Sequence, residues 1–289
     1  MRDEIIELND ETRKSASGSF IQLSDGTTHY ELGGNESGEV VVLVHGFSVP
    51  YFIYGPTFKF LTASGFRVLR YDLFGRGFSD RPNRNYNIDF FVNQLTELLD
   101  ALRFTQPVNL IGLSMGGPIV STFTIRHPER VNKLMLIDPA GVKSTALTPM
   151  LKAAKMPFVA EAVLGLAGSE RLIENAARDF FNPALVEHFK AQYKVQMQFK
   201  GFKRAILSSI RNGMLGSFID VYAALGKMNK SILLFWGRND ITVPFEHSKV
   251  LCETIPQIEF HIIEECGHIP HYEKPERVNP ILLEFLRQT

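Results

Sequence analysis

A serine placed between glycines is the first candidate for chemistry in this chain. Ser114 lies in the stretch GLSMG, after the apolar run of residues 107–111 and before a segment with a helical pattern. The flanking glycines permit a tight turn, which would present the hydroxyl to the positive end of the following helix. A G-x-S-x-G sequence between a strand and a helix predicts a nucleophile elbow. From the pentapeptide alone, a glycine-rich turn with an incidental serine is the alternative.

A serine hydroxyl is weakly nucleophilic at neutral pH, so this chemistry requires a base and an acid that orients the base. His268 lies between the last strand-like run and the C-terminal helical segment, and we predict that it takes the proton of Ser114. Asp240 follows the strand-like run of residues 231–236, and we predict that its carboxylate holds the imidazole in one tautomer. The chain order serine, aspartate, histidine is one in which such triads occur.

Two backbone N–H groups are candidates for an oxyanion hole. Phe47 follows an early strand-like run that ends in the letters VHG, and Met115 directly follows Ser114. Peptide N–H groups at these places could stabilise the negative charge that develops on a carbonyl oxygen during acyl transfer. We expect His45, beside this loop, to support it by hydrogen bonds rather than to transfer a proton.

Four other polar residues have alternative roles. Asp138 follows a strand-like run and is an alternative triad acid, although the letters DPAG are also typical of a turn. Asp72 and Arg76 are expected to fix a loop rather than to bind substrate. His271, close after His268, is expected at the pocket rim or on the surface.

The elements that must position these residues alternate between strands and helices. Five short runs are apolar on both faces, as the strands of a buried parallel sheet are, and they cover residues 40–46, 67–72, 108–114, 133–138 and 231–237. Apolar residues also recur at helical spacing in two segments, 91–102 and 278–286. This alternation predicts an α/β fold with a doubly wound, mostly parallel sheet. Residues 19–32 predict a hairpin around a turn at Asp25 and Gly26.

Residues 143–225 break this rhythm, because they contain no strand-like run. We predict that they form a helical cap inserted into a core domain of residues 1–142 and 226–289. The segment holds four of the eight methionines and seven phenylalanines, which suit an adaptable apolar cavity, although packing between cap helices also accounts for them. It carries 11 Lys and Arg against 6 Asp and Glu. Arg204 is the candidate partner for a substrate carboxylate, with a solvated charged face as the alternative.

Composition bears on the class of partner and on cofactors. The chain has 289 residues, of which 45% are hydrophobic, so it can bury a large core. The 31 basic residues balance the 31 acidic ones, so we expect neither a nucleic acid nor an anionic membrane as partner. With no apolar run of membrane-spanning length and no leader pattern, we expect a cytoplasmic protein. We expect no metal and no other cofactor, and we expect Cys252 and Cys266 to be free thiols.

Five motifs together resemble the α/β-hydrolase superfamily, namely HGFS, YDLFGRGFSDRP, GLSMGG, WGRND and CGHIPHYEKPE. They resemble in particular its capped branch of non-lipase esterases and C–C hydrolases, from about Phe20 to the C-terminus. The resemblance implies that Ser114, Asp240 and His268 occupy the triad positions. It also implies that the oxyanion-hole positions are those of Phe47 and Met115. A serine at the elbow disfavours the dehalogenases and epoxide hydrolases of the superfamily, whose nucleophile is an aspartate.

Two departures from the branch bear on the reaction. Its C–C hydrolases commonly have a Gly-Pro-Gly oxyanion loop and a tryptophan after the catalytic histidine, whereas this chain has HGFSVPY and Ile269. We therefore expect a carboxylesterase that cleaves small to medium esters through an acyl-serine, with C–C hydrolysis of ring-fission products by the same triad as the first alternative. Trp236 resembles the tryptophan of cofactor-free haloperoxidases and perhydrolases, which form a second alternative. A ligand receptor without turnover is the third.

Overall fold

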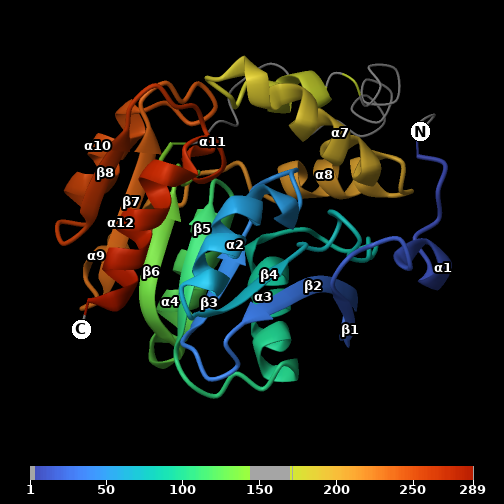
Figure 1. Cartoon of the computed structure of the whole chain (residues 1–289), viewed down its shortest axis with the longest axis horizontal. Helices are drawn as coiled ribbons and strands as arrows, with labels where there is room; N and C mark the ends of the chain where they lie inside the picture. The colour runs from blue at the N-terminus through green and yellow to red at the C-terminus, as the bar shows by residue number, and fades with distance from the viewer. Residues whose placement is uncertain (1–3, 144–169, 171, 289) are drawn as a thin grey trace.

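The computed structural model describes residues 4–143, 170 and 172–288. An eight-stranded sheet forms the centre of the molecule, with the strand order β1-β2-β4-β3-β5-β6-β7-β8 (Figure 1). The strands are β1 (Ser19–Leu23), β2 (Gly26–Gly34), β3 (Val40–Val44), β4 (Arg67–Tyr71), β5 (Val108–Leu113), β6 (Val131–Ile137), β7 (Ser231–Gly237) and β8 (Glu259–Ile263). The sheet is parallel from β4 to β8, while β1 and β2 attach antiparallel at one edge. The predicted, mostly parallel α/β fold is confirmed.

The central strands bury side chains on both faces, as their sequences predict. In β3, Val42 and Val44 belong to the hydrophobic core on one face of the sheet. Val41 and Leu43 belong to the core on the other face, because successive side chains of a strand point in opposite directions. Each face of the sheet therefore requires its own layer of helices.

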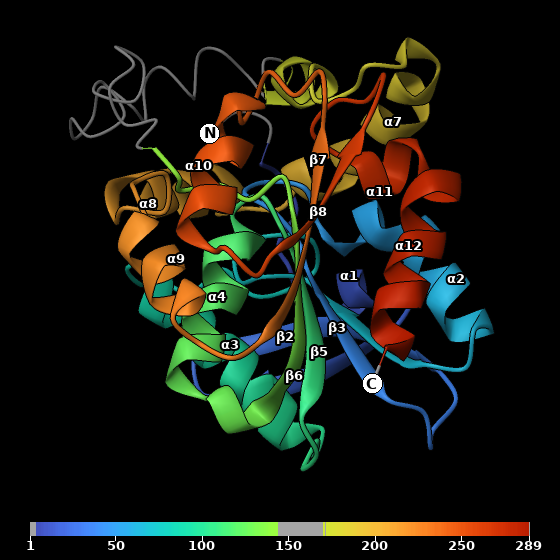
Figure 2. The ribbon, with the colours of Figure 1, turned by 90° about the vertical axis from the view of Figure 1, so that its left-hand side faces the viewer.

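Helices cover both faces of the sheet (Figure 2). One layer contains α3 (Ile88–Ala101), α4 (Gly116–Arg126), α9 (Ile219–Gly226) and α10 (Glu246–Thr254). The other layer contains α2 (Gly55–Ala63), α11 (Pro270–Glu273) and α12 (Pro275–Arg287). Shorter elements are α1 (Asp10–Arg13), η1 (Tyr51–Tyr54), η2 (Pro128–Arg130) and η3 (Pro183–Leu185).

The hairpin of β1 and β2 forms as predicted, but its loop lies one residue earlier than expected. Leu23 pairs with Gly26, so the two loop residues are Ser24 and Asp25. Gly26 is the first residue of β2 and has a φ of 147°, which side chains rarely allow. A Cβ at this position would lie 2.8 Å from the Cβ of Asp80. Glycine is therefore needed at the start of the strand rather than within the loop.

Two further helices of the predicted cap segment lie over loops of the core (Figure 1). They are α7 (Val186–Met197) and α8 (Phe202–Arg211). Gln196 of α7 donates from Nε2 to the carbonyl oxygen of Ser48 at 2.7 Å, and its Oε1 accepts from the N–H of Gly77 at 2.9 Å. These bonds join α7 to the loops that follow β3 and β4. Residues 144–169 and 171 of this segment lie outside the described residues, so the domain boundaries stay a prediction.

The N-terminal segment also binds the cap helices. The carboxylate of Glu4 accepts from the backbone N–H groups of Lys203 at 2.6 Å and Gly201 at 3.2 Å. Gly201 is the N-cap residue of α8 and has no side chain that could accept these bonds. Ile6 pairs with Phe199 through an isolated β-bridge. Glu4 thus supplies the cap at the N-terminus of α8 from a distant part of the chain.

A buried lysine ties the last helix to the central sheet. Lys133 in β6 is only 7% exposed. Its Nζ donates to the carbonyl oxygens of Phe285, Leu286 and Gln288 at the C-terminal end of α12. This end of a helix carries a partial negative charge, which stabilises the ammonium group.

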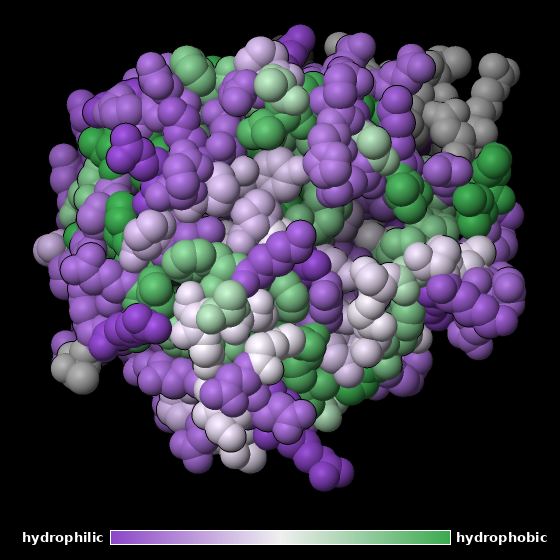
Figure 3. All heavy atoms as spheres, in the orientation of Figure 1, coloured by the Kyte–Doolittle hydropathy of each residue, from purple (hydrophilic) through white to green (hydrophobic). Residues whose placement is uncertain are grey.

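None of the described helices is both long and apolar enough to cross a bilayer. On the face shown in Figure 3, apolar side chains form small scattered groups between polar ones. Cys252 and Cys266 are free thiols, as predicted.

Candidate active site

Ser114 lies on the sharp turn between β5 and α4. Its φ is 50°, in the left-handed region that is strained for a residue with a Cβ. Three backbone bonds hold this conformation. The N–H of Ser114 donates to Ile137 at 2.9 Å, and its carbonyl oxygen accepts from the N–H groups of Gly117 at 2.9 Å and Ala140 at 3.0 Å. A strained turn fixed in this way between a strand and a helix has the geometry of a nucleophile elbow.

Two glycines let the backbone of β3 approach this turn. A Cβ on Gly116 would lie 2.2 Å from the carbonyl oxygen of Val44, so a side chain there would clash with the sheet. A Cβ on Gly46 would lie 3.2 Å from the Cβ of Ser114. The loop that begins at Gly46 therefore runs directly beside the predicted nucleophile.

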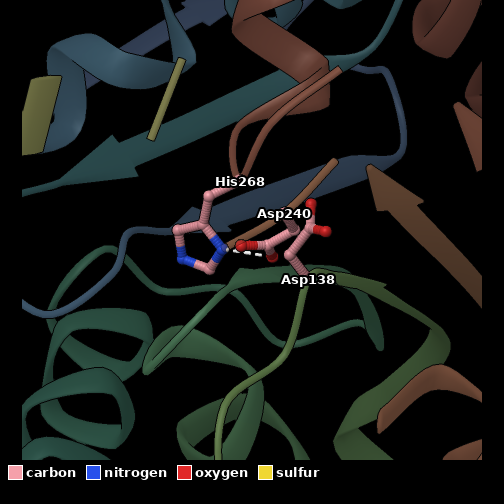
Figure 4. Close-up of side chains that lie close together, drawn as sticks. All are labelled: Asp138, Asp240 and His268. Carbon is pink, nitrogen blue, oxygen red and sulfur yellow. Dashed lines mark hydrogen bonds and ion pairs between the residues drawn. The ribbon is translucent and has the colours of Figure 1, made fainter. Parts of the chain in front are cut away.

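The predicted base and the predicted acid form a buried pair (Figure 4). Nδ1 of His268 lies 2.7 Å from Oδ2 of Asp240, and the two residues are 4% and 5% exposed. Oδ1 of Asp240 accepts from the backbone N–H groups of Thr242 at 2.8 Å and Val243 at 2.9 Å. Since the carboxylate accepts the Nδ1 proton, Nε2 is the nitrogen that can take a proton from a substrate or a nucleophile.

The charge of Asp240 controls the basicity of His268. Burial alone would lower the pKa of His268, but the negative charge of Asp240 and its hydrogen bond outweigh burial and raise this pKa to about 8. Asp240 thus stabilises the imidazolium form of His268, which is the form that a general base has after it has taken a proton.

Asp138, the alternative acid, lies beside Asp240 rather than in direct contact with His268 (Figure 4). Oδ1 of Asp138 accepts from the N–H of Gly237 at 2.9 Å, while its buried Oδ2 has no hydrogen-bond partner among the described residues. One ligating atom from each of Asp138, Asp240 and His268 lies within 4.8 Å of the others, which makes them the one candidate group for a metal ion in the described part of the chain. Because Asp240 and His268 already bond to each other, we interpret the group as an acid–base pair with a neighbouring carboxyl.

The oxyanion loop is supported by the ring of His45. Its Nδ1 donates to the carbonyl oxygen of Gly46 at 3.0 Å, and its Nε2 accepts from the N–H of Leu73 at 2.9 Å. Burial lowers the pKa of His45 to about 4, so the ring is neutral and this tautomer is fixed. The carbonyl of Gly46 and the N–H of Phe47 belong to one peptide group. A hydrogen bond to that carbonyl polarises the peptide and strengthens its N–H as a donor.

Asp72 and Arg76 fix loops, as expected from the sequence. The fully buried guanidinium of Arg76 donates from Nε to the carbonyl oxygen of Phe47 at 2.8 Å. The carboxylate of Asp72 accepts from the backbone N–H groups of Tyr51 at 2.9 Å and Phe78 at 3.0 Å. Both residues therefore hold the backbone around the predicted oxyanion hole.

The cap candidate Arg204 is engaged by another loop. Its Nη1 donates to the carbonyl oxygen of Pro82 at 3.1 Å and to Oδ1 of Asn83 at 3.2 Å. Its Nη2 donates to the carbonyl oxygen of Arg81. In this structure the guanidinium of Arg204 thus joins α8 to residues 81–83.

Two other candidates are packed in the interior. Trp236 is fully buried, and its Nε1 donates to the carbonyl oxygen of Val243 at 3.1 Å, which braces the loop of Asp240. The expectation that His271 lies at the rim or on the surface is wrong. His271 is fully buried, and its ring packs against Tyr54 with centroids 4.7 Å apart. It lies on α11, a helix of four residues, which is too short for a hydrophobic pattern to indicate which side is buried.

A segment before α7 contacts the loops of Asp240 and His268, which the sequence did not predict. The N–H of His268 donates to the carbonyl oxygen of Asp179 at 2.7 Å, and Oγ1 of Thr242 donates to Oδ1 of Asp179 at 2.5 Å. Glu273 of α11 accepts from the N–H of Phe181 at 2.9 Å. The carboxylate of Glu273, close after His268, was the one sequence signal for this contact. It could not identify the partner, because Phe181 lies far away in sequence.

Residues 39–275 match the family model described as the alpha/beta hydrolase fold. The chain belongs to the α/β-hydrolase fold family. Among relatives of this α/β hydrolase is the 2-hydroxy-6-oxo-6-phenylhexa-2,4-dienoate hydrolase of Comamonas testosteroni. It is 30% identical over 286 residues, which cover 96% of this chain and 97% of the relative. This confirms the resemblance of the motifs to the superfamily.

Two solved structures are similar to this α/β hydrolase over nearly its whole length. A meta-cleavage product hydrolase from Pseudomonas fluorescens IP01 is 26% identical with a TM-score of 0.75, and the match covers 93% of this chain and 97% of that one. A thermophilic esterase from Thermogutta terrifontis is 26% identical with a TM-score of 0.78, covering 94% and 98%. A meta-cleavage product hydrolase and an esterase therefore share this fold.

Proposed function

We propose that this α/β hydrolase is a serine hydrolase that cleaves small to medium carboxylic esters through an acyl-serine. The hydrogen-bonded pair of His268 and Asp240 carries the proposal. Ser114 is tied by its backbone to Ile137 and Ala140, and Asp138 between them approaches the pair. The proposal is supported by the topology, since Ser114, Asp240 and His268 all follow the carboxyl ends of parallel strands, which lie at one edge of the sheet.

The reaction has two halves. Nε2 of His268 takes the hydroxyl proton as Oγ of Ser114 bonds to the ester carbonyl carbon, and the N–H groups of Phe47 and Met115 hold the oxyanion. The C–O bond of the ester then breaks, and His268 gives its proton to the leaving alcohol. Water, deprotonated by His268, attacks the acyl carbon. The bond from that carbon to Oγ then breaks, and His268 returns the proton to Oγ, which releases the carboxylic acid and restores Ser114.

An uncharged ester is consistent with the bonding of two arginines that could otherwise bind a substrate carboxylate. Arg76, beside the oxyanion loop, donates to the carbonyl oxygen of Phe47, and Arg204 donates to the loop of residues 81–83. A substrate carboxylate would have to displace these bonds. Ile269, which follows His268, also departs from the tryptophan common in C–C hydrolases.

Hydrolysis of a C–C bond is the second candidate function. It is supported by the relative from Comamonas testosteroni, whose name specifies a dienoate substrate and whose match extends over 96% of this chain. The same triad would act on a ketone carbonyl of a ring-fission product. The departures at the oxyanion loop and at Ile269 count against this candidate.

The deciding experiment measures kcat/KM for p-nitrophenyl esters of increasing acyl length and for a ring-fission dienoate. We expect short-chain esters to be turned over fastest, and Ser114→Ala to lower kcat by at least about 10³-fold, as the loss of a triad member does. Ser121→Ala is the matched control, since its buried hydroxyl on α4 has no hydrogen-bond partner among the described residues. Faster turnover of the dienoate would favour the C–C hydrolase. Peracid formation from acetate and peroxide, with little ester turnover, would favour a perhydrolase.

Retention of ester turnover in Ser114→Ala would refute the proposed nucleophile. Ligand-induced stabilisation of the protein without turnover of any of these substrates would favour the receptor alternative.

A further inference from the structure

Asp138 is a buried carboxyl group that the proposed reaction does not use. It is fully buried at the end of β6, and its φ of 42° lies in the left-handed region. Its Oδ1 is fixed by the N–H of Gly237, while Oδ2 has no partner among the described residues. Asp240 lies between Asp138 and His268 (Figure 4). A strained, buried acid in this position requires an explanation.

Two buried carboxyl groups this close do not both ionise, because each charge disfavours the other and water cannot screen them. Asp240 receives three N–H groups, from Thr242, Val243 and the imidazole of His268, all of which favour its charged form. Asp138 receives one, from Gly237. The single proton therefore belongs on Asp138. Consistently, burial and the charge of Asp240 raise the pKa of Asp138 well above its usual range.

The other titratable groups around Asp138 do not change this assignment. They are Cys266, from the loop after β8, and Asp179, from the segment before α7. Neither can carry a positive charge, so neither would stabilise an ionised Asp138. Two histidines nearby can be cationic. Nδ1 of His268 is bonded to Asp240, and the charge of Asp240 acts on His247 of α10, so both favour an ionised Asp240.

We propose that Asp138 is a positioning residue, a neutral carboxylic acid whose Oδ2–H donates to the carboxylate of Asp240. The proposal rests on the proposed function, in which Asp240 orients His268. The triad is thereby extended to Ser114, His268, Asp240 and Asp138. The extra donor holds the Asp240 carboxylate in the plane that His268 requires, without adding a second negative charge beside the imidazole.

The first test needs no substrate and follows the imidazole signals of His268 by NMR as the pH is changed. Asp138→Asn removes the acid but keeps an N–H donor and an acceptor for Gly237, and asparagine tolerates a positive φ. We expect His268 to titrate near pH 8 in both the wild type and this variant. An infrared difference spectrum should contain the carbonyl band of a protonated carboxylic acid that disappears in Asp138→Asn. A fall of the pKa of His268 by about one unit or more, or the absence of that band, would overturn the proposal.

The second test compares kcat and KM for the best ester. Asp138→Ala removes the donor, and we expect kcat to fall about tenfold with little change in KM, the loss typical of one hydrogen bond to a charged group. Asp138→Asn should recover most of that loss. Equal activity of Asp138→Ala and the wild type would also overturn the proposal. If Asp138→Ala does not fold, the NMR and infrared results for Asp138→Asn still decide. Because they involve no turnover, they also separate this proposal from a failure of the proposed esterase function.

Discussion

At the residue scale, the candidate site depends on the protonation states of neighbouring buried groups. His45 and His268 are both buried, yet burial keeps His45 neutral whereas Asp240 favours the charged form of His268. The difference follows from their hydrogen-bond partners, since the ring of His45 bonds to the backbone of Gly46 and Leu73, whereas the ring of His268 bonds to a carboxylate. The ring of His45 is thereby suited to support of a peptide group, and the ring of His268 is suited to transfer of a proton.

Removal of the His45 ring should weaken the oxyanion hole without changing the catalytic base. For His45→Ala we expect kcat/KM to fall about tenfold, less than the loss of a direct oxyanion donor, because His45 acts through the peptide of Gly46 and Phe47. The pH at which activity rises should stay near the pKa of His268. The measurement is the pH profile of kcat/KM, with the exposed His188→Ala as control. A displaced profile would indicate that His45 itself transfers protons.

At the element scale, strands and local motifs were predictable, whereas contacts between distant segments were not. The runs that became β3 to β7 are apolar on both faces, a pattern that few other structures produce. The elbow at Ser114 could be recognised because turn, strand and helix adjoin in sequence. By contrast, the bond between Thr242 and Asp179 joins residues 63 positions apart, and no local pattern encodes it. The hairpin loop lies one residue earlier than predicted, because glycine is needed at position 26 to avoid a clash with Asp80 rather than to form the loop.

Glu4 provides an element-scale prediction, since it caps α8 from outside the helix. Glu4→Ala should leave the N–H groups of Gly201 and Lys203 without this acceptor and lower the local stability of α8 by about 1 kcal/mol, a typical value for a lost helix cap. Hydrogen exchange should show faster exchange of the α8 amides. Glu7→Ala is the control, because it removes only an exposed ion pair with Lys200. Equal exchange in Glu4→Ala and the wild type would contradict the capping role.

At the scale of the whole molecule, another buried histidine, His29, joins the N-terminal segment to the sheet. Nδ1 of His29 lies 2.7 Å from Oδ2 of Asp72, and Nε2 lies 2.6 Å from the carbonyl oxygen of Ser17. Both neighbours are acceptors, so both nitrogens must donate and the ring is an imidazolium. Burial lowers the pKa of His29, but the hydrogen bond and charge of Asp72 outweigh it, and the pKa is raised above 6.5.

Global stability should therefore decline as the pH rises. The contribution of His29 is complete below pH 6.5 and is lost as the pH passes its raised pKa, by about 1.4 kcal/mol for each pH unit that separates the two. Urea unfolding of the wild type between about pH 6 and pH 9 should show this fall. His29→Gln should be less stable at pH 6 and show a smaller fall. His268 and Asp138, whose pKa values are also raised, contribute to the fall that remains. Parallel curves for the two proteins would show that His29 is neutral.

The buried ammonium of Lys133 also bears on the order in which the protein assembles. The carbonyl groups that accept its hydrogen bonds are synthesised at least 152 residues later. Until α12 docks, the charged group at the beginning of β6 lacks these partners and has to stay hydrated, because burial of an unpaired charge is unfavourable. This part of the sheet therefore stays incompletely buried while the ribosome is still translating the segment between β6 and α12. During that interval the growing chain exposes an incomplete sheet, the kind of nascent surface that chaperones recognise.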